Sequence, residues 1–131
     1  MPENVKFTLL GFTALMAAVG LGAFGAHGLE NTLSAKQIAT YQTGIEYLFY
    51  HGLGALALAS LSQSLNLDFK RSRWAMTVGM LIFSGGCMIY AVTSQKFIAM
   101  AIPLGGLGYL FCWALAIKDL AAKFKTQAKS S

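Results

Sequence analysis

Five residues of the sequence have side chains that could take part in chemistry. They are two histidines, a glutamate, a tyrosine and a serine, namely His27, Glu46, Tyr47, His51 and Ser84. An imidazole carries protons near neutral pH and binds metals, and a neighbouring carboxylate or hydroxyl could bind a ligand or relay a proton. Which of these roles is open depends on the elements that hold the five side chains.

Those elements are long apolar runs. Of the 131 residues, 56% are hydrophobic and only 11% are charged, against about a quarter in an ordinary soluble domain. Four runs of roughly 20 residues are long enough to cross a hydrocarbon core about 30 Å thick. The sequence therefore predicts an all-α protein, a single four-helix transmembrane domain over 1–131, with spans at about 7–28, 46–65, 74–93 and 97–117.

Helices are favoured over a membrane barrel because no segment alternates apolar and polar residues. Between the first two spans, Ser34 followed by Gln37 matches a capping box, and apolar residues recur after it at helical spacing. We expect a short interfacial helix here, which turns into the second span near Gly44.

The first run is longer than the core of a signal peptide and "MPENVK" is hardly basic, so we expect this run to stay in the mature protein.

The basic residues predict the orientation. Eight of the ten lie before the first run, between the second and third runs, or after the fourth, and only Lys36 and Lys96 lie in the other two connections. The positive-inside rule then places both termini in the cytoplasm. The net charge of +5 is divided among three short clusters beside the membrane without an aromatic platform, so we predict lipid as a partner and no nucleic acid.

The five polar residues lie near the outer ends of these predicted spans. Polar side chains within a span usually face protein or water, because exposure to lipid is costly. We therefore expect a shared outer polar layer, in which His27 contacts a polar group of the first outer connection or the second helix.

Small residues predict how the helices pack. They form one stripe through Gly11, Gly22 and Gly25 of the first run and another through Gly105 and Gly108 of the fourth, at the spacing that lets backbones approach in lipid. Such stripes could also support self-association or binding to other membrane proteins. Pro103 removes a hydrogen bond inside the fourth run, so we expect a kink or a broken first turn there.

Four motifs along the chain, "GAFGAHGL", "TGIEYLFYH", "FSGG" and "IPLGG", resemble those of the YgdD/YwdK-type family of small bacterial membrane proteins, which is related to a mitochondrial transmembrane family. The resemblance implies four helices in the bacterial inner membrane and no established activity. The third motif differs from the expected "FSGS" at Gly86. The positions that the resemblance implies to matter are Gly22, Phe24, Gly25, His27, Gly44, Glu46, Tyr47, His51, Ser84, Gly85, Pro103 and Gly105.

Three functions remain open. The first is a non-enzymatic membrane assembly or interaction protein, which the lack of phosphate-loop, zinc-protease and nucleophile-elbow motifs favours. The second is a site for a small ligand, a lipid or a proton around His27, Glu46, Tyr47 and His51. The third is a metal or haem site with His27 and His51 as the two ligands. Two separated histidines are a weak metal signal, so we predict no metal site, no cofactor and no catalytic residue.

Overall fold

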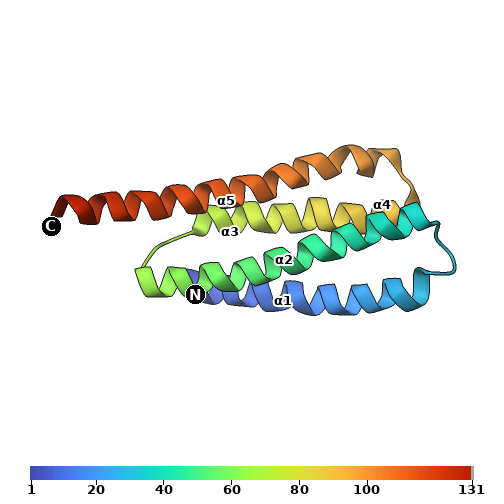
Figure 1. The fold of residues 1–131 in the computed structure, drawn as a ribbon, viewed down its shortest axis with the longest axis horizontal. Helices are drawn as coiled ribbons and strands as arrows, with labels where there is room; N and C mark the ends of the chain where they lie inside the picture. Colours follow the sequence, from blue (N-terminus) through green and yellow to red (C-terminus); the bar gives the residue numbers. More distant parts are fainter. Residues whose placement is uncertain (131) are drawn as a thin grey trace.

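The apolar runs form long helical rods in the computed structural model, which describes residues 1–130 (Figure 1). The first rod is α1 (Glu3–Phe24) with a π-helical turn, η1 (Gly25–Leu29), at its end. The second is α2 (Ala35–Leu65). The third joins α3 (Lys70–Gly79), the π-helical turn η2 (Met80–Ser84) and α4 (Gly85–Thr93), and the fourth is α5 (Lys96–Ser130). Every regular element within 1–130 is helical, which confirms the predicted all-α class.

The predicted capping box begins α2. The Ser34 hydroxyl accepts a hydrogen bond from the Gln37 backbone, and the Gln37 side chain accepts one from the Ser34 backbone. The helix does not turn at Gly44, however, so the segment predicted as a short interfacial helix is the first part of a continuous α2. No proline interrupts this helix, and Gly44 lies in a contact with the third rod rather than in a bend.

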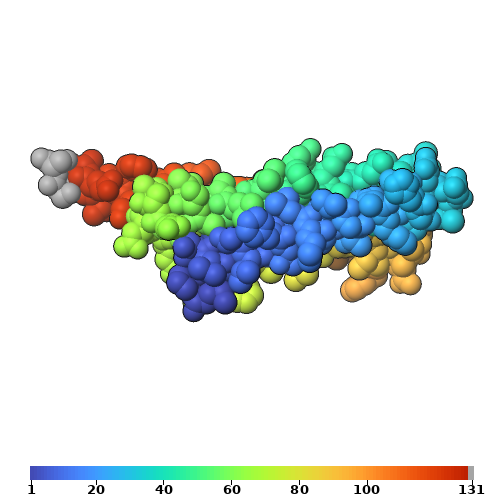
Figure 2. All heavy atoms as spheres, turned by 90° about the horizontal axis from the view of Figure 1, so that it is seen from below, coloured from blue at the N-terminus to red at the C-terminus, as the bar shows by residue number. Residues whose placement is uncertain are grey.

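The rods lie side by side in the order α1, α2, the third rod and α5 (Figure 1). The second and third rods are therefore in the middle, whereas α1 and α5 are at the two sides. Figure 2 shows α1, in blue, across one face of the elongated molecule with α2 beside it. The buried core includes Phe7, Ala55, Met76 and Cys112, which come from all four rods.

The two outer rods expose large apolar side chains along their length. Phe12 and Met16 of α1 are 59% and 72% exposed, and Phe97 and Leu110 of α5 are 81% and 67% exposed. Apolar surface of this extent is costly in water and suits a lipid environment. Three rods, at Glu3–Leu29, Lys70–Thr93 and Lys96–Lys129, are long and apolar enough to cross a membrane. The less apolar α2 is not among them, so the fourth crossing stays a prediction.

Two glycines let α2 and α5 approach the backbone of η2. A Cβ atom on Gly44 of α2 would lie 2.7 Å from the Ser84 carbonyl oxygen, and one on Gly105 of α5 would lie 2.8 Å from the Phe83 Cα. Both distances are too short for a real side chain, and the opposing atoms belong to the backbone. These two contacts set the spacing of three of the four rods.

We predict that Gly105→Ala destabilises the bundle by about 1–3 kcal/mol, because the added methyl group has to push two backbones apart. The matched control is Gly106→Ala, whose Cβ would meet the Phe83 ring at 3.5 Å, an ordinary contact. Equilibrium unfolding in mixed micelles, followed by circular dichroism, compares the two variants. Equal stability of the two variants would contradict the close approach at Gly105.

Candidate functional site

An aromatic and polar cluster joins α2, η2 and α5 near the middle of the bundle. Tyr47 and His51 lie one turn apart on α2, Tyr109 and Trp113 lie one turn apart on α5, and Ser84 ends η2. We call these five residues the His51 cluster. His51, Ser84 and Tyr109 are buried, whereas Tyr47 and Trp113 are 40% and 37% exposed at its edge.

Both ring nitrogens of His51 take part in hydrogen bonds. The Trp113 Nε1–H group donates to His51 Nε2 at 3.2 Å, and His51 Nδ1 lies 2.8 Å from the Tyr47 carbonyl oxygen. An indole N–H can only donate, so Nε2 must carry a lone pair, and a carbonyl can only accept, so Nδ1 must carry the proton. The arrangement therefore specifies a neutral imidazole in the Nδ1–H form.

Tyr109 covers one face of this imidazole. The two rings are stacked, with centroids 3.5 Å apart and planes 14° apart. The Tyr109 hydroxyl is 2.7 Å from the Ser84 hydroxyl, so the two groups form a buried hydrogen bond between α5 and η2. The Phe83 ring borders the cluster, with its centroid 4.8 Å from that of the Tyr47 ring. Each buried polar side chain of the His51 cluster thus has a partner inside it.

The outer edge of the His51 cluster borders a lateral groove of about 490 Å³. Its walls are mainly apolar and come from α2, η2 and α5, with Pro103, Leu107 and Leu110 beside the cluster residues. The groove could receive part of a lipid or of a neighbouring helix. His51 could bind such a ligand through Nε2 only after Trp113 had released that atom.

The structure separates His27 from the His51 cluster. Gly52 of α2 packs against Leu15 of α1, and His27 lies twelve residues beyond Leu15, which is about 18 Å along the rod. His27 is exposed in η1, and its side chain forms no hydrogen bond within 1–130. The predicted contact of His27 with a polar group of the first connection or the second helix is therefore not supported by any side-chain hydrogen bond within 1–130. The two histidines do not lie at similar depth, and they do not form a pair of metal ligands.

Glu46 also lies apart from the His51 cluster. Its side chain is exposed and borders a groove of about 460 Å³ between the last turns of the first rod and the first turns of α2, together with Glu30 and Tyr41. The Tyr41 hydroxyl crosses to donate to the Leu21 carbonyl oxygen at 2.7 Å.

Of the five residues predicted as a polar site, Tyr47, His51 and Ser84 come together, while His27 and Glu46 do not join them. No group of three or more potential metal-binding side chains lies within 1–130.

Tyr109 and Trp113 are not among the site residues that the sequence predicts. Tyr109 follows Gly105 by four residues and precedes Cys112 by three, so it lies on the packed face of α5. A tyrosine between the small residues of a packing stripe is a signal for a buried hydroxyl that needs a partner. Trp113 gave no such signal, because its bond to His51 depends on the spacing between α2 and α5.

The residues predicted to pack or bend the helices lie in different surroundings. A Cβ would be too close to its neighbours at Gly25 and Gly44 and, as noted, at Gly105, and would be tight at Gly108. A Cβ on Gly22 would make an ordinary 3.4 Å contact with Ile45, and one on Gly85 would meet only the Met80 carbonyl oxygen at 3.8 Å. α5 continues through Pro103, so its first turn is not broken.

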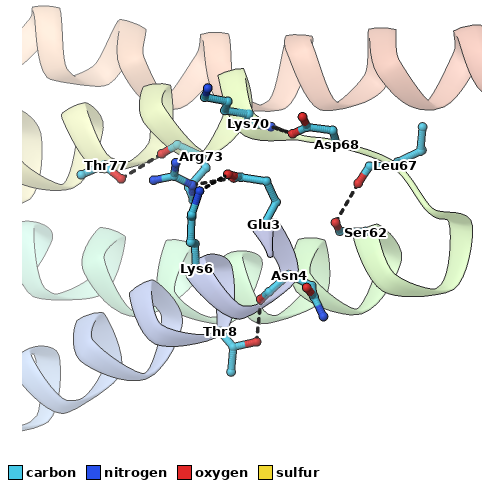
Figure 3. Close-up of polar contacts among 10 residues, drawn as sticks. All are labelled: Glu3, Asn4, Lys6, Thr8, Ser62, Leu67, Asp68, Lys70, Arg73 and Thr77. Atoms are coloured by element: carbon cyan, nitrogen blue, oxygen red, sulfur yellow. Dashed lines mark hydrogen bonds and ion pairs between the residues drawn. The ribbon is translucent and has the colours of Figure 1, made fainter. Parts of the chain in front are cut away.

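A second polar cluster ties the rods together at the end where the chain begins (Figure 3). Glu3 accepts hydrogen bonds from Lys6 Nζ at 2.6 Å and from Arg73 Nε at 2.8 Å, which links the start of α1 to α3. Ser62 and Asp68 fix the turn between α2 and α3 by bonding to the backbone of Leu67 and Lys70. Arg73 also lies over the Trp74 ring, 5.0 Å from its centroid.

These features define an α-helical integral membrane protein whose polar side chains meet between helices. The chain belongs to the family described as protein of unknown function (DUF423), whose model matches residues 21–106. Its similarity to YwdK and YgdD confirms the resemblance predicted from the sequence motifs. The matched range contains Tyr47, His51 and Ser84 but ends before Tyr109 and Trp113.

Named membrane proteins share most of the chain. UPF0382 membrane protein SSP2132 of Staphylococcus saprophyticus is 39% identical over 111 residues, which is 85% of this chain and 92% of the relative. UPF0382 membrane protein YwdK of Bacillus subtilis is 36% identical over 85% of this chain and 92% of its own length. UPF0382 inner membrane protein YgdD of Escherichia coli is 36% identical over 76% of each chain. No solved structure matches.

Proposed function

We propose that this chain is a non-enzymatic protein of the bacterial cytoplasmic membrane that acts by binding other membrane components. The observation that carries this proposal is the closed hydrogen bonding of the His51 cluster. His51 has no free nitrogen, and the hydroxyls of Ser84 and Tyr109 bond to each other. A general base or a metal ligand needs a free lone pair, which neither ring nitrogen of His51 has, so His51 serves the bundle rather than a reaction.

The proposed topology has four spans in one domain, with both termini in the cytoplasm. α2 lies alongside α1 and α4, both of which belong to rods of spanning length, so α2 crosses the membrane with them. Eight of the ten basic residues then lie on the cytoplasmic side. The relative YgdD carries the name of an inner membrane protein, which agrees with this location.

Partners would bind to the outer faces of α1 and α5. The small-residue stripes that could have joined two copies are already used inside the chain, because Gly11 packs against α2 and Gly105 against η2. The faces that carry Phe12 and Phe111 are exposed over their length and remain open to other proteins or lipids.

A second candidate function is a lateral site for a lipid or small ligand in the groove beside Tyr47, His51 and Trp113. The specific support is the volume of about 490 Å³ next to the imidazole. The two functions differ in what substitution of His51 should do. A structural His51 sets the amount of folded protein, whereas a binding His51 sets activity per molecule.

Cysteine labelling tests the topology, with Cys87 and Cys112 replaced by alanine. Thr32→Cys and Thr126→Cys introduce thiols at two exposed positions and leave the charge unchanged. We expect a membrane-impermeant maleimide to label Thr32→Cys in intact spheroplasts, and Thr126→Cys only after permeabilisation. Labelling of Thr126→Cys from outside would reverse the proposed orientation.

Complementation at matched abundance tests the proposed function. In a strain that lacks the gene, we expect His51→Ala to lower the membrane abundance of the protein, because Trp113 and Tyr109 lose their partner. When expression is raised to the wild-type level, we expect wild-type behaviour to return. The control His27→Ala, at an exposed position, should change neither quantity.

Loss of function by His51→Ala at wild-type abundance would contradict the structural role and favour the ligand site. Photo-crosslinking with a photoreactive residue in place of Phe12 or Phe111 tests directly whether a protein partner binds there. Binding to a membrane protein should give a discrete protein adduct from one of these faces, and adducts with lipid alone would exclude a protein partner at both positions.

A further inference from the structure

A second lateral groove runs between α1 and the third rod, on a part of the molecule separate from the His51 cluster. Its inner section, of about 380 Å³, is bordered by Leu10, Ala14 and Ala17 of α1 and by Thr77 and Leu81 of the third rod. Its outer section, of about 470 Å³, continues between Phe24 and Val92. Gly85, Met88 and Ile89 border both sections, so the two sections adjoin each other along the rods.

The groove is long enough to hold a lipid chain. From Leu10 to Phe24 it follows α1 for fourteen residues, or about 21 Å. One leaflet contributes about half of the ~30 Å hydrocarbon core, so an acyl chain fits within the groove. Leu48 and Tyr41 of α2 form its floor, while Leu81 and Ile89 at its rim are 71% and 52% exposed. The groove is therefore open sideways to the lipid.

Two cations lie beyond the inner end of this groove. Lys6 precedes Leu10 by one helical turn on α1, and Arg73 precedes Thr77 by one turn on α3. Glu3 holds both side chains toward each other, as Figure 3 shows, and neutralises only one of the two charges. Arg73 uses its Nε atom for Glu3, and within 1–130 its two terminal nitrogens have no protein acceptor.

The level of these cations corresponds to lipid headgroups. The exposed Trp74 ring lies beside Arg73, and tryptophan concentrates at membrane interfaces because its ring is apolar and its N–H is polar. Lys70 and Arg71 lie on the same end of α3 and add positive potential there. The basic residues at this level suit the anionic headgroup of a phospholipid, and the apolar groove beside them suits one of its acyl chains.

We propose that this groove binds one anionic phospholipid, with its phosphate between Lys6 and Arg73 and one acyl chain along α1 and the third rod. In the proposed orientation the lipid comes from the cytoplasmic leaflet. The site does not depend on the function proposed for the His51 cluster, and its binding can be measured in detergent whichever way the protein is inserted.

Native mass spectrometry of the delipidated protein tests this site with phosphatidylglycerol and with phosphatidylcholine of the same acyl chains. We expect one phosphatidylglycerol to bind with roughly tenfold preference or more, since a basic residue near the surface adds about 1 kcal/mol of attraction for anionic lipid. Lys6→Gln combined with Arg73→Gln should reduce that affinity at least tenfold. The control, Lys125→Gln with Lys129→Gln, removes the same charge from exposed positions at the end of α5 and should leave the affinity unchanged.

Ala17→Trp tests the acyl part of the site and leaves its charges intact. Ala17 borders the inner section of the groove, so a tryptophan there fills the space and should abolish binding. Ala23→Trp, at an exposed position that does not border the groove, is its control. If the Lys6/Arg73 variant unfolds, the comparison of Ala17→Trp with Ala23→Trp decides whether the lipid binds in the groove.

Three results would overturn the proposal. The first is equal loss of binding in the Lys6/Arg73 variant and in the Lys125/Lys129 control, which would show attraction to total charge alone. The second is undiminished binding by Ala17→Trp. Competition by inorganic phosphate with no requirement for an acyl chain would assign the cations to a free anion and would also reject the lipid site.

Discussion

The close approach of three backbones at η2 is the constraint on which the rest of the bundle depends. Gly44 lets α2 approach the Ser84 carbonyl oxygen, and Gly105 lets α5 approach Phe83 from another side. In lipid there is little hydrophobic driving force between helices, so close packing and interhelical hydrogen bonds hold them together. The π-helical turn thus lies where the two middle rods and α5 meet.

The position of the His51 cluster follows from this spacing. With α5 held against η2, Tyr109 reaches both the Ser84 hydroxyl and the face of the His51 ring, and Trp113 reaches His51 Nε2 one turn further on. Each of these hydrogen bonds contributes about 1 kcal/mol or less in a membrane, but an unpaired polar group in its place would be costly. The polar residues therefore select this arrangement of the helices over others with equally apolar surfaces.

The helical class could be predicted from the sequence because a run of about 20 apolar residues is a local property. The start of α2 at Ser34 was also predictable, since its capping box lies within four residues. The depth of His51 in the bundle was not predictable in this way. With the polar segment before Gly44 taken as a separate helix, His51 was placed near the outer boundary, whereas in the continuous α2 it lies sixteen residues after Ala35.

The hydrogen-bond partners of His51 could not be predicted from the sequence, for a different reason. They come from α5, and nothing in the pattern of apolar and small residues states how far α5 lies from α2. The extra residue that a π-helical turn accommodates also shifts which side chains of the third rod face the bundle. The tight contacts at Gly44 and Gly105 and the turn at η2 are properties of the assembled helices.

Both ring nitrogens of His51 form hydrogen bonds inside the bundle, and the proposed structural role of His51 depends on these two bonds. Nitrogen-15 NMR of the protein in lipid bilayers at neutral pH tests it directly, because His27→Gln leaves His51 as the single histidine of the chain. We expect a neutral ring with its proton on Nδ1, and an Nε2 resonance that shifts in the additional variant Trp113→Phe. A proton on Nε2, or a doubly protonated ring, would contradict it.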